Sequence, residues 1–197
     1  MPTATLMRSP IPLDTDTAFV KSKRRAAHLR LFELILSAVL GALTFALKVA
    51  MAALPNIHPV ALMLLLCTLV FSWRAFVSCG IYIVMEGIFF GFSTWWIPYL
   101  YTWPLFVLLI LLFKKRKNPF FWATFAGIFG FLFGFFFLPV NYFVYDMANH
   151  PELILPYILN DLPFNAIHAV SNFIIVLVLL PPLKKGMEMA LKRIYHK

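Results

Sequence analysis

Long apolar runs, each near the length of a membrane crossing and separated by short polar breaks, dominate the chain. The runs are continuously apolar, which is typical of transmembrane helices, because roughly 20 apolar residues cross the bilayer core. The pattern therefore predicts an all-α, polytopic membrane protein. Six transmembrane helices are expected, over residues 31–53, 59–73, 75–92, 97–113, 119–139 and 163–180.

The composition supports the same class of protein. Hydrophobic residues make up 62% of the 197 residues and charged residues only 13%, whereas about a quarter of a soluble domain is charged. The net charge of +9 comes from basic clusters that flank the apolar runs. That placement favours contact with membrane lipid and gives no indication of nucleic-acid binding.

The positions of lysine and arginine indicate how the helices cross the membrane. If the N-terminal tail is cytoplasmic and Arg74 is a turn, then Arg74, the 114–117 cluster and the C-terminal tail all face the cytoplasm. The outward connections contain no Lys or Arg and cover 54–58, 93–97 and 145–162. We therefore expect a multi-pass protein of the bacterial plasma membrane with both termini in the cytoplasm.

The predicted membrane domain covers residues 30–183. Residues 1–29 combine prolines with basic side chains and are expected to form a flexible cytoplasmic tail. After Pro181 and Pro182, residues 184–197 alternate apolar and basic side chains. This alternation predicts a short amphipathic helix on the inner leaflet.

Small residues repeat along the first predicted helix. Alanines occupy every fourth position, at Ala38, Ala42, Ala46 and Ala50. On a helix this spacing makes a ridge without bulk, against which another helix can pack closely. The ridge either binds a partner subunit or packs within its own bundle.

Three ionisable residues, Lys48, Glu86 and His168, lie inside apolar segments, where such groups are costly and often functional. Lys48 either extends its ammonium group to the membrane surface or pairs with Glu86. Asn165, His168 and Asn172 follow the i, i+3, i+7 spacing of one helix face. The two asparagines either face a ligand or hydrogen-bond a neighbouring helix.

Polar and aromatic side chains gather at the outward ends of the predicted helices, as a small-molecule pocket requires. Trp96 is alternatively an interfacial anchor, and His58 is alternatively an ordinary turn residue. The candidate ligand-binding residues are Lys48, His58, Glu86, Trp96, Tyr99, Asn141, Tyr145, Asn165, His168 and Asn172.

Motifs for catalysis are missing from the sequence. It contains no phosphate-binding P-loop, no His-Glu-x-x-His zinc motif and no Gly-x-Ser-x-Gly elbow. We therefore expect no enzymatic activity, no metal site and no ATP hydrolysis by this chain alone.

Several segments together resemble one family of transport proteins. The turn at 54–60 reads LPNIHPV, residues 86–92 read EGIFFGF, residues 96–104 read WIPYLYTWP, and residues 162–168 read LPFNAIH. With the basic tail and the alanine ridge before them, they resemble the substrate-binding S component of energy-coupling factor (ECF) transporters. The likeness covers about 30 to 185 and is nearest to the cobalamin branch.

The resemblance implies a subunit that binds a vitamin near the outer surface and delivers it through a transmembrane coupling subunit and two cytoplasmic ATPases. It implies that Ala38, Ala42, Ala46 and Ala50 contact the coupling subunit. Cobalamin is the favoured ligand, and folate, pantothenate or a queuosine precursor are alternatives. Two rival functions are a lipid-modifying membrane enzyme that uses His168 and Glu86, and a membrane scaffold that binds no small molecule.

Overall fold

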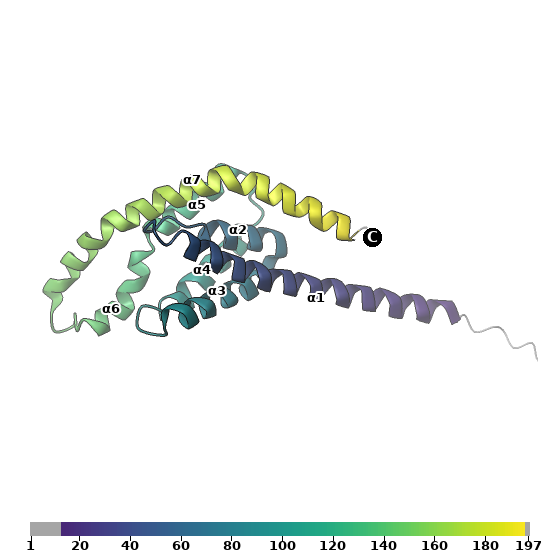
Figure 1. The fold of residues 1–197 in the computed structure, drawn as a ribbon, viewed down its shortest axis with the longest axis horizontal. Helices are drawn as coiled ribbons and strands as arrows, with labels where there is room; N and C mark the ends of the chain where they lie inside the picture. Colours follow the sequence, from purple (N-terminus) through teal and green to yellow (C-terminus); the bar gives the residue numbers. More distant parts are fainter. Residues whose placement is uncertain (1–12, 196–197) are drawn as a thin grey trace, which may run out of the picture.

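The computed structural model describes residues 13–195, and all of the regular elements in this range are helical (Figure 1). This confirms the all-α prediction. The α-helices are α1 (Leu13–Ala50), α2 (Val60–Phe71), α3 (Ala75–Phe90), α4 (Tyr99–Phe113), α5 (Pro119–Phe131), α6 (Leu138–Val144) and α7 (Ile154–Tyr195). Short 3₁₀ segments lie at η1 (Ser72–Arg74), η2 (Gly134–Phe137) and η3 (Pro151–Leu153).

Three helical runs among the described residues are long and apolar enough to cross a membrane. Two of them are Phe19–Ala50 and Pro151–Ile194. The third, Val60–Phe90, joins α2, η1 and α3 and folds back on itself at η1. The pair Pro119–Phe131 and Gly134–Val144, bent by 43°, forms a fourth if it is one span. By length and composition the chain is therefore a membrane-embedded protein.

Helix α2 is antiparallel to α1 and α3, which are parallel to each other. Ser72 adopts a φ of 58°, which ends α2 and lets η1 turn the chain into α3. Arg74 at the start of α3 pairs with Glu33 of α1 at 2.8 Å, and Glu86 near the end of α3 pairs with Lys48. Residue numbers rise together along the two helices, so α1 and α3 are parallel.

The second half of the chain continues this alternation of direction. At the end of α4, Lys114 Nζ donates to Ser72 Oγ at 3.2 Å, which places this end beside the α2–α3 turn. Asn118 then caps α5 by accepting from the Phe120 amide at 2.9 Å. Pairings of Gly134 with Asn165 and of Ala126 with Asn172 show that α5 and α7 are antiparallel.

The core of the bundle is built around α2. Ten of its 12 residues are buried, because other helices cover it on nearly all sides. Both cysteines, Cys67 and Cys79, are buried free thiols in this core. The helices around it, α1, α3, α4, α5 and α7, carry the exposed apolar side chains.

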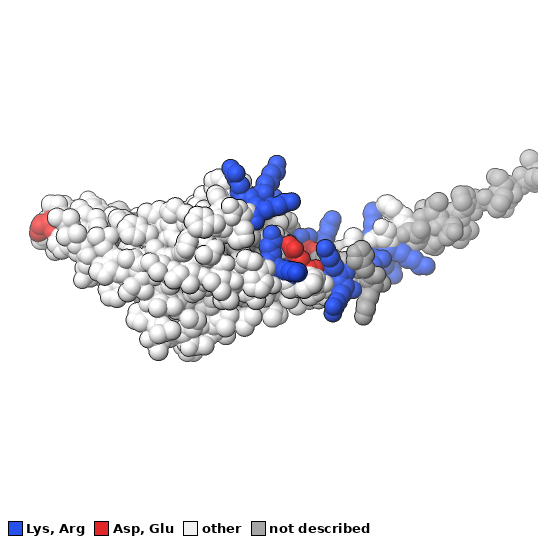
Figure 2. Space-filling model, turned by 90° about the horizontal axis from the view of Figure 1, so that it is seen from above, with Lys and Arg blue, Asp and Glu red and all other residues white. Residues whose placement is uncertain are grey.

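Charged side chains are distributed unevenly over the molecule. Figure 2 shows Lys and Arg gathered toward the end where α1 projects, while the opposite end carries acidic side chains and no visible basic ones. The same basic end includes the α2–α3 turn and the end of α4, which Lys114 and Ser72 join. This is the separation of charge that the positive-inside rule describes.

Two predicted helix boundaries at the ends of the chain are wrong. Helix α1 begins at Leu13, within the expected flexible tail, because residues 13–30 are rich in helix-forming Ala, Lys and Arg and contain no Gly or Pro. Residues 1–12 of that tail lie outside the described part of the chain. Helix α7 passes through Pro181 and Pro182, so the basic stretch expected as a separate amphipathic helix continues α7, which curves in Figure 1.

Two further boundaries differ inside the chain. The helix expected over 119–139 is broken at Leu132–Phe133, since Gly134 is a weak helix former and Pro139 cannot donate to the preceding turn. The polar connection expected over 145–162 ends at Leu153. Residues from Ile154 onward are helical, and this first part of α7 is held to α6 by Tyr157, whose hydroxyl accepts from Asn141 Nδ2 at 2.7 Å.

Helices α1 and α3 come close together at Gly41, and this yields a prediction. A Cβ on Gly41 would meet the Ser78 carbonyl oxygen at 2.5 Å, whereas a Cβ on Gly80 would meet nothing within 4 Å. We expect Gly41→Ala to destabilise the protein by about 1–3 kcal/mol. Gly80→Ala should be neutral or stabilising by up to about 1 kcal/mol, because alanine favours the helix. Thermal unfolding in detergent measures both, and equal effects would contradict the close contact.

Candidate functional site

A buried ion pair between α1 and α3 is the centre of the candidate site. Lys48 Nζ lies 2.5 Å from Glu86 Oε2, so the pairing that the sequence left open is present. The Glu86 side chain is fully buried, while 20% of the Lys48 side chain is exposed. Lys48 comes from the last turn of α1, where its flexible side chain reaches both the bundle and its surface.

Aromatic rings surround the Lys48 ammonium. Its nitrogen lies 5.3 Å from the centre of the Tyr99 ring and 5.5 Å from that of Phe90. It also donates a long hydrogen bond of 3.4 Å to the Tyr99 hydroxyl. Trp95 packs edge-on against Tyr99, with ring centres 5.6 Å apart. A cation over aromatic faces is stabilised by the electron density of the rings.

Two cavities lie on either side of this cluster and share the lining residues Lys48, Phe90 and Tyr99. One has a volume of about 400 Å³ and is completed by Glu86 and Trp95. The other has a volume of about 280 Å³ and extends over the 51–58 connection to His58 and Phe133. Their volumes fall near the lower end of the range typical of small-molecule sites.

His58 and His168 meet beside the second cavity. Their ring centres are 5.1 Å apart, and the His168 ring also packs against Phe133 at 4.9 Å. The connection that carries His58 is held to α7, since Ser171 Oγ donates to the Asn56 carbonyl at 2.9 Å. Asn56 itself adopts a φ of 58°, a conformation that asparagine tolerates better than most residues.

Several buried polar atoms near these cavities have no hydrogen-bond partner among the described residues. They include Glu86 Oε1, His58 Nδ1, His168 Nε2 and the Tyr82 hydroxyl. Buried polar atoms are nearly always paired, and leaving one unpaired costs roughly 1–3 kcal/mol. Unpaired atoms on both sides of the Lys48 cluster are what a site that binds a polar ligand would present.

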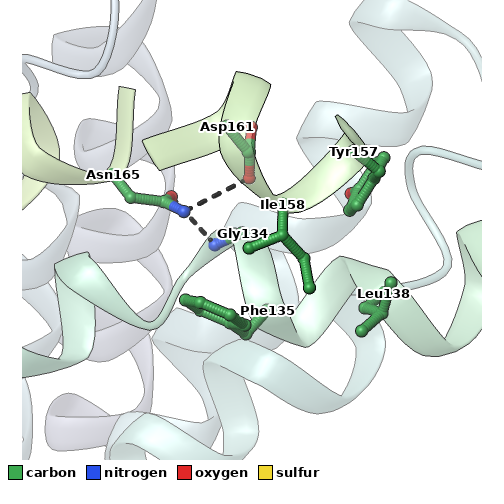
Figure 3. Close-up of a pocket in the computed structure, with 7 residues that line it drawn as sticks. All are labelled: Gly134, Phe135, Leu138, Tyr157, Ile158, Asp161 and Asn165. Carbon is green, nitrogen blue, oxygen red and sulfur yellow. Dashed lines mark hydrogen bonds between the residues drawn. The ribbon is translucent and has the colours of Figure 1, made fainter. Parts of the chain in front are cut away.

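Asn165, His168 and Asn172, the polar stripe of α7, play two different parts. His168 meets His58, whereas the two asparagines bond neighbouring segments. Asn165 accepts from the Gly134 amide at 3.1 Å and donates to Asp161 at 3.3 Å, as Figure 3 shows. Asn172 donates to the Ala126 carbonyl at 3.4 Å. Both asparagines therefore join α7 to the α5–η2 segment, and the cavity beside Asn165, of about 10 Å³, has about the room of one water molecule.

Three other predicted residues do not line the two cavities. Trp96 donates its indole N–H to the Ile83 carbonyl at 2.8 Å, which ties the 93–98 connection to α3. Asn141 bonds Tyr157, and Tyr145, which is 54% exposed, packs near that tyrosine with ring centres 6.4 Å apart. Asn141 and Tyr145 lie with α6 and the start of α7, away from the Lys48 cluster.

Other site residues were missed by the sequence analysis. Phe90, Trp95 and Phe133 line the cavities, and the Tyr82 ring stacks on Tyr99. A signal for two of them was present, because Tyr82, Glu86 and Phe90 are spaced four apart and share one face of α3. Phe133 had no such signal, since it lies where the expected helix is broken.

The alanine ridge lies on the outside of the bundle. Ala38 and Ala42 are half-buried, whereas Ala46 and Ala50 are exposed. The face of α1 that packs on α3 is a different one and contains Ser37, whose carbonyl accepts from Ser78 Oγ at 2.6 Å. The ridge is therefore not sealed against α3.

Comparisons of the chain with protein-family models, with curated proteins and with solved structures found no match. Within residues 13–195, no group of three or more His, Cys, Asp or Glu side chains could hold a metal ion.

Burial of His58 yields a prediction about pH. Burial, followed by the neighbouring His168 and Lys48 side chains, lowers the pKa of His58 from 6.5 to about 3. The folded state keeps this ring neutral while the unfolded state takes up a proton, so stability falls as the pH drops below 6.5. Between pH 7 and pH 5 the loss from His58 is up to about 2 kcal/mol.

We expect His58→Gln to make the pH dependence of the melting temperature shallower over this interval. His150, which is exposed, supplies the matched control, and His150→Gln should leave the slope unchanged. Identical slopes for all three proteins would show that His58 is accessible to protons when folded.

Proposed function

We propose that this chain is the substrate-binding S component of an ECF-type vitamin importer. It captures its ligand from outside the cell and delivers it through a transmembrane coupling subunit and two ATPases. The observation that carries the proposal is the pair of cavities around Lys48, which combine aromatic walls with unpartnered buried polar atoms. Such a combination suits a ligand with both flat apolar and polar parts.

The proposed topology has six spans with both termini in the cytoplasm. The alternating direction of α1, α2, α3, α4, α5 and α7 supports it, with η2 and α6 continuing α5. The basic end of the bundle then faces the cytoplasm, and the Lys48 cluster lies toward the outer surface. Short spans such as α2 suit this arrangement because other helices surround them and they need little contact with lipid.

Cobalamin is the ligand favoured by the family resemblance, and its large size requires the site to open. A corrin ring with its substituents is larger than either cavity, so the 51–58 connection, which lines the smaller one, must move aside to admit it. Folate, pantothenate and a queuosine precursor are smaller alternatives that demand less movement. His58 and Asn56, which lie in that connection, would then close over the bound vitamin.

The exposed alanine ridge is the proposed contact for the coupling subunit. Ala46 and Ala50 flank Lys48 on α1, so the same turn of helix carries a ligand-binding residue and part of the ridge. A surface without bulk lets a partner helix approach closely and separate again. This geometry gives ligand binding a direct route to the partner.

Binding of a vitamin to the isolated chain is the first test. Titration calorimetry against a vitamin panel should find one that binds. Tyr99→Leu should weaken its affinity at least about tenfold, because more than 1.4 kcal/mol of ring and hydroxyl contacts is lost. Tyr145→Leu is the matched control and should bind like the wild type, because Tyr145 lines neither cavity. If no vitamin binds the wild-type chain, the capture role is wrong.

Uptake by the assembled transporter is the second test. Ala46→Trp places a bulky ring on the ridge at an exposed position, so it should abolish uptake without changing vitamin binding to the free subunit. Leu108→Trp, at an exposed position of α4, should leave both measurements unchanged. Normal uptake by the Ala46 variant would remove the coupling role of the ridge.

A further inference from the structure

The ammonium group of Lys48 lies in a cage formed by the Glu86 carboxylate and the Tyr99 and Phe90 rings. The same cage would suit the cationic group of a ligand. The Lys48 nitrogen lies 2.5 Å from Glu86 Oε2 and 5.3–5.5 Å from the centres of the Tyr99 and Phe90 rings. A carboxylate beside aromatic faces is how proteins bind ammonium-type ligands. Lys48 thus occupies the cage as a tethered cation.

The two partners of the ion pair differ in how easily they can separate. Glu86 is fully buried and lies one turn before the end of α3, where the helix backbone fixes its position, so it cannot follow a departing partner. Lys48 is 20% exposed and ends a flexible four-carbon chain, which lets its charge turn toward the surface. Separation therefore moves Lys48 and leaves the cage in place.

Glu86 also has unused capacity for a ligand. Its Oε1 atom is buried and accepts no hydrogen bond of regular geometry, although the Tyr82 hydroxyl lies close to the same carboxylate. The adjoining cavity of about 400 Å³, with Trp95 as a further wall, has room for the body of a ligand whose cationic head enters the cage. A ligand N–H could donate to Oε1 while its charge replaces that of Lys48.

An anionic head would fit the cage less well. Inside the cage it would meet the negative charge of Glu86 and the electron-rich faces of Phe90 and Tyr99, all of which oppose it. It could pair with the Lys48 ammonium at the cavity wall, but this would leave Lys48 in place rather than displace it. A neutral head would leave Glu86 without its counter-charge once Lys48 moved. The cage thus favours a cation over the other two classes.

We infer that the ligand of this site carries an organic cation, of the ammonium type or another N–H-bearing cation, which enters the cage and displaces Lys48 from Glu86. The inference rests on the proposed function only in treating this cavity as the capture site. It places cationic ligands ahead of anionic ones such as folate and pantothenate. The amide N–H groups of cobalamin can donate to Glu86 Oε1 but carry no charge, so cobalamin ranks below the cationic ligands and above the anionic ones.

Removal of the tethered cation provides the test. In Lys48→Met the cage is empty and Glu86 lacks a counter-ion, so ethylammonium chloride should raise the melting temperature of the purified protein. At about 100 times its dissociation constant the rise should be roughly 5 °C or more. Sodium chloride at the same ionic strength and ethanol, the neutral isostere, should not reproduce it.

Two variants separate the cage from general salt effects. The double variant Lys48→Met with Glu86→Gln retains the rings but loses the charge, and it should not respond to ethylammonium. Lys115→Met, which removes an exposed lysine, should not respond either. The inference is overturned if the Lys48 variant shows no specific response or if the double variant responds equally.

A measurement on the wild-type protein keeps the inference testable if the Lys48 variants fail to fold. Acetic anhydride acetylates free lysines, and mass spectrometry gives the modification of Lys48 relative to Lys115. Trimethylammonium chloride, whose cation carries an N–H and forms no stable acetamide, should raise this ratio several-fold by driving Lys48 out of the cage. The neutral 2-methylpropan-2-ol, a molecule of similar size, should not. An unchanged ratio with trimethylammonium at saturating concentration would overturn the displacement.

The outcomes also separate this inference from the proposed function. If a vitamin without a cationic group binds tightly and leaves Lys48 acetylation unchanged, vitamin capture stands and the cation assignment is wrong. If ethylammonium stabilises the Lys48 variant specifically but no vitamin binds the wild-type chain, the cage stands and vitamin capture is wrong.

Discussion

The ion pair between Lys48 and Glu86 constrains the whole bundle. Removing two charges from water is costly, and a buried pair is tolerated only when both charges stay matched. The pair lies at one end of the α1–α3 contact, and Glu33 with Arg74 lies at the other with the signs reversed. Only the parallel arrangement in this register satisfies both pairs, so these charges specify how α1 sits on α3. The cavities exist because the helices are held in this register.

Much of the helical layout was predictable from the long apolar runs. Helices in a membrane satisfy their own backbone hydrogen bonds and need apolar side chains along their whole length. The turn at Arg74 was predictable from the positions of the basic residues. Had Arg74 been in the middle of a helix, the basic 114–117 cluster would have been on the outer side of the membrane. Helix ends were not predictable in this way. Pro181 and Pro182 indicated an end to α7, but a membrane helix tolerates proline where neighbours compensate for the lost bond.

The candidate site was predictable only in part. Lys48 and Glu86 were conspicuous as charges in apolar segments. The two residues are 38 positions apart in sequence, however, so their pairing depends on the register of α1 against α3. The polar stripe on α7 predicted a shared face correctly, but not that Asn165 and Asn172 would bond α5 while the His168 ring meets His58. Such a division depends on where the α5–η2 break falls, and that break places Gly134 rather than a bulky side chain against Asn165.

The length of α1 has a mechanical consequence. Its 38 residues span about 57 Å at 1.5 Å per residue, nearly twice the roughly 30 Å of hydrocarbon that a span requires. Because Lys48 lies in the final turn, a tilt of about 5° there displaces the opposite end by about 5 Å, as on a rigid rod of that length. A small rearrangement around Lys48 would therefore move the distant end of α1 by several ångströms.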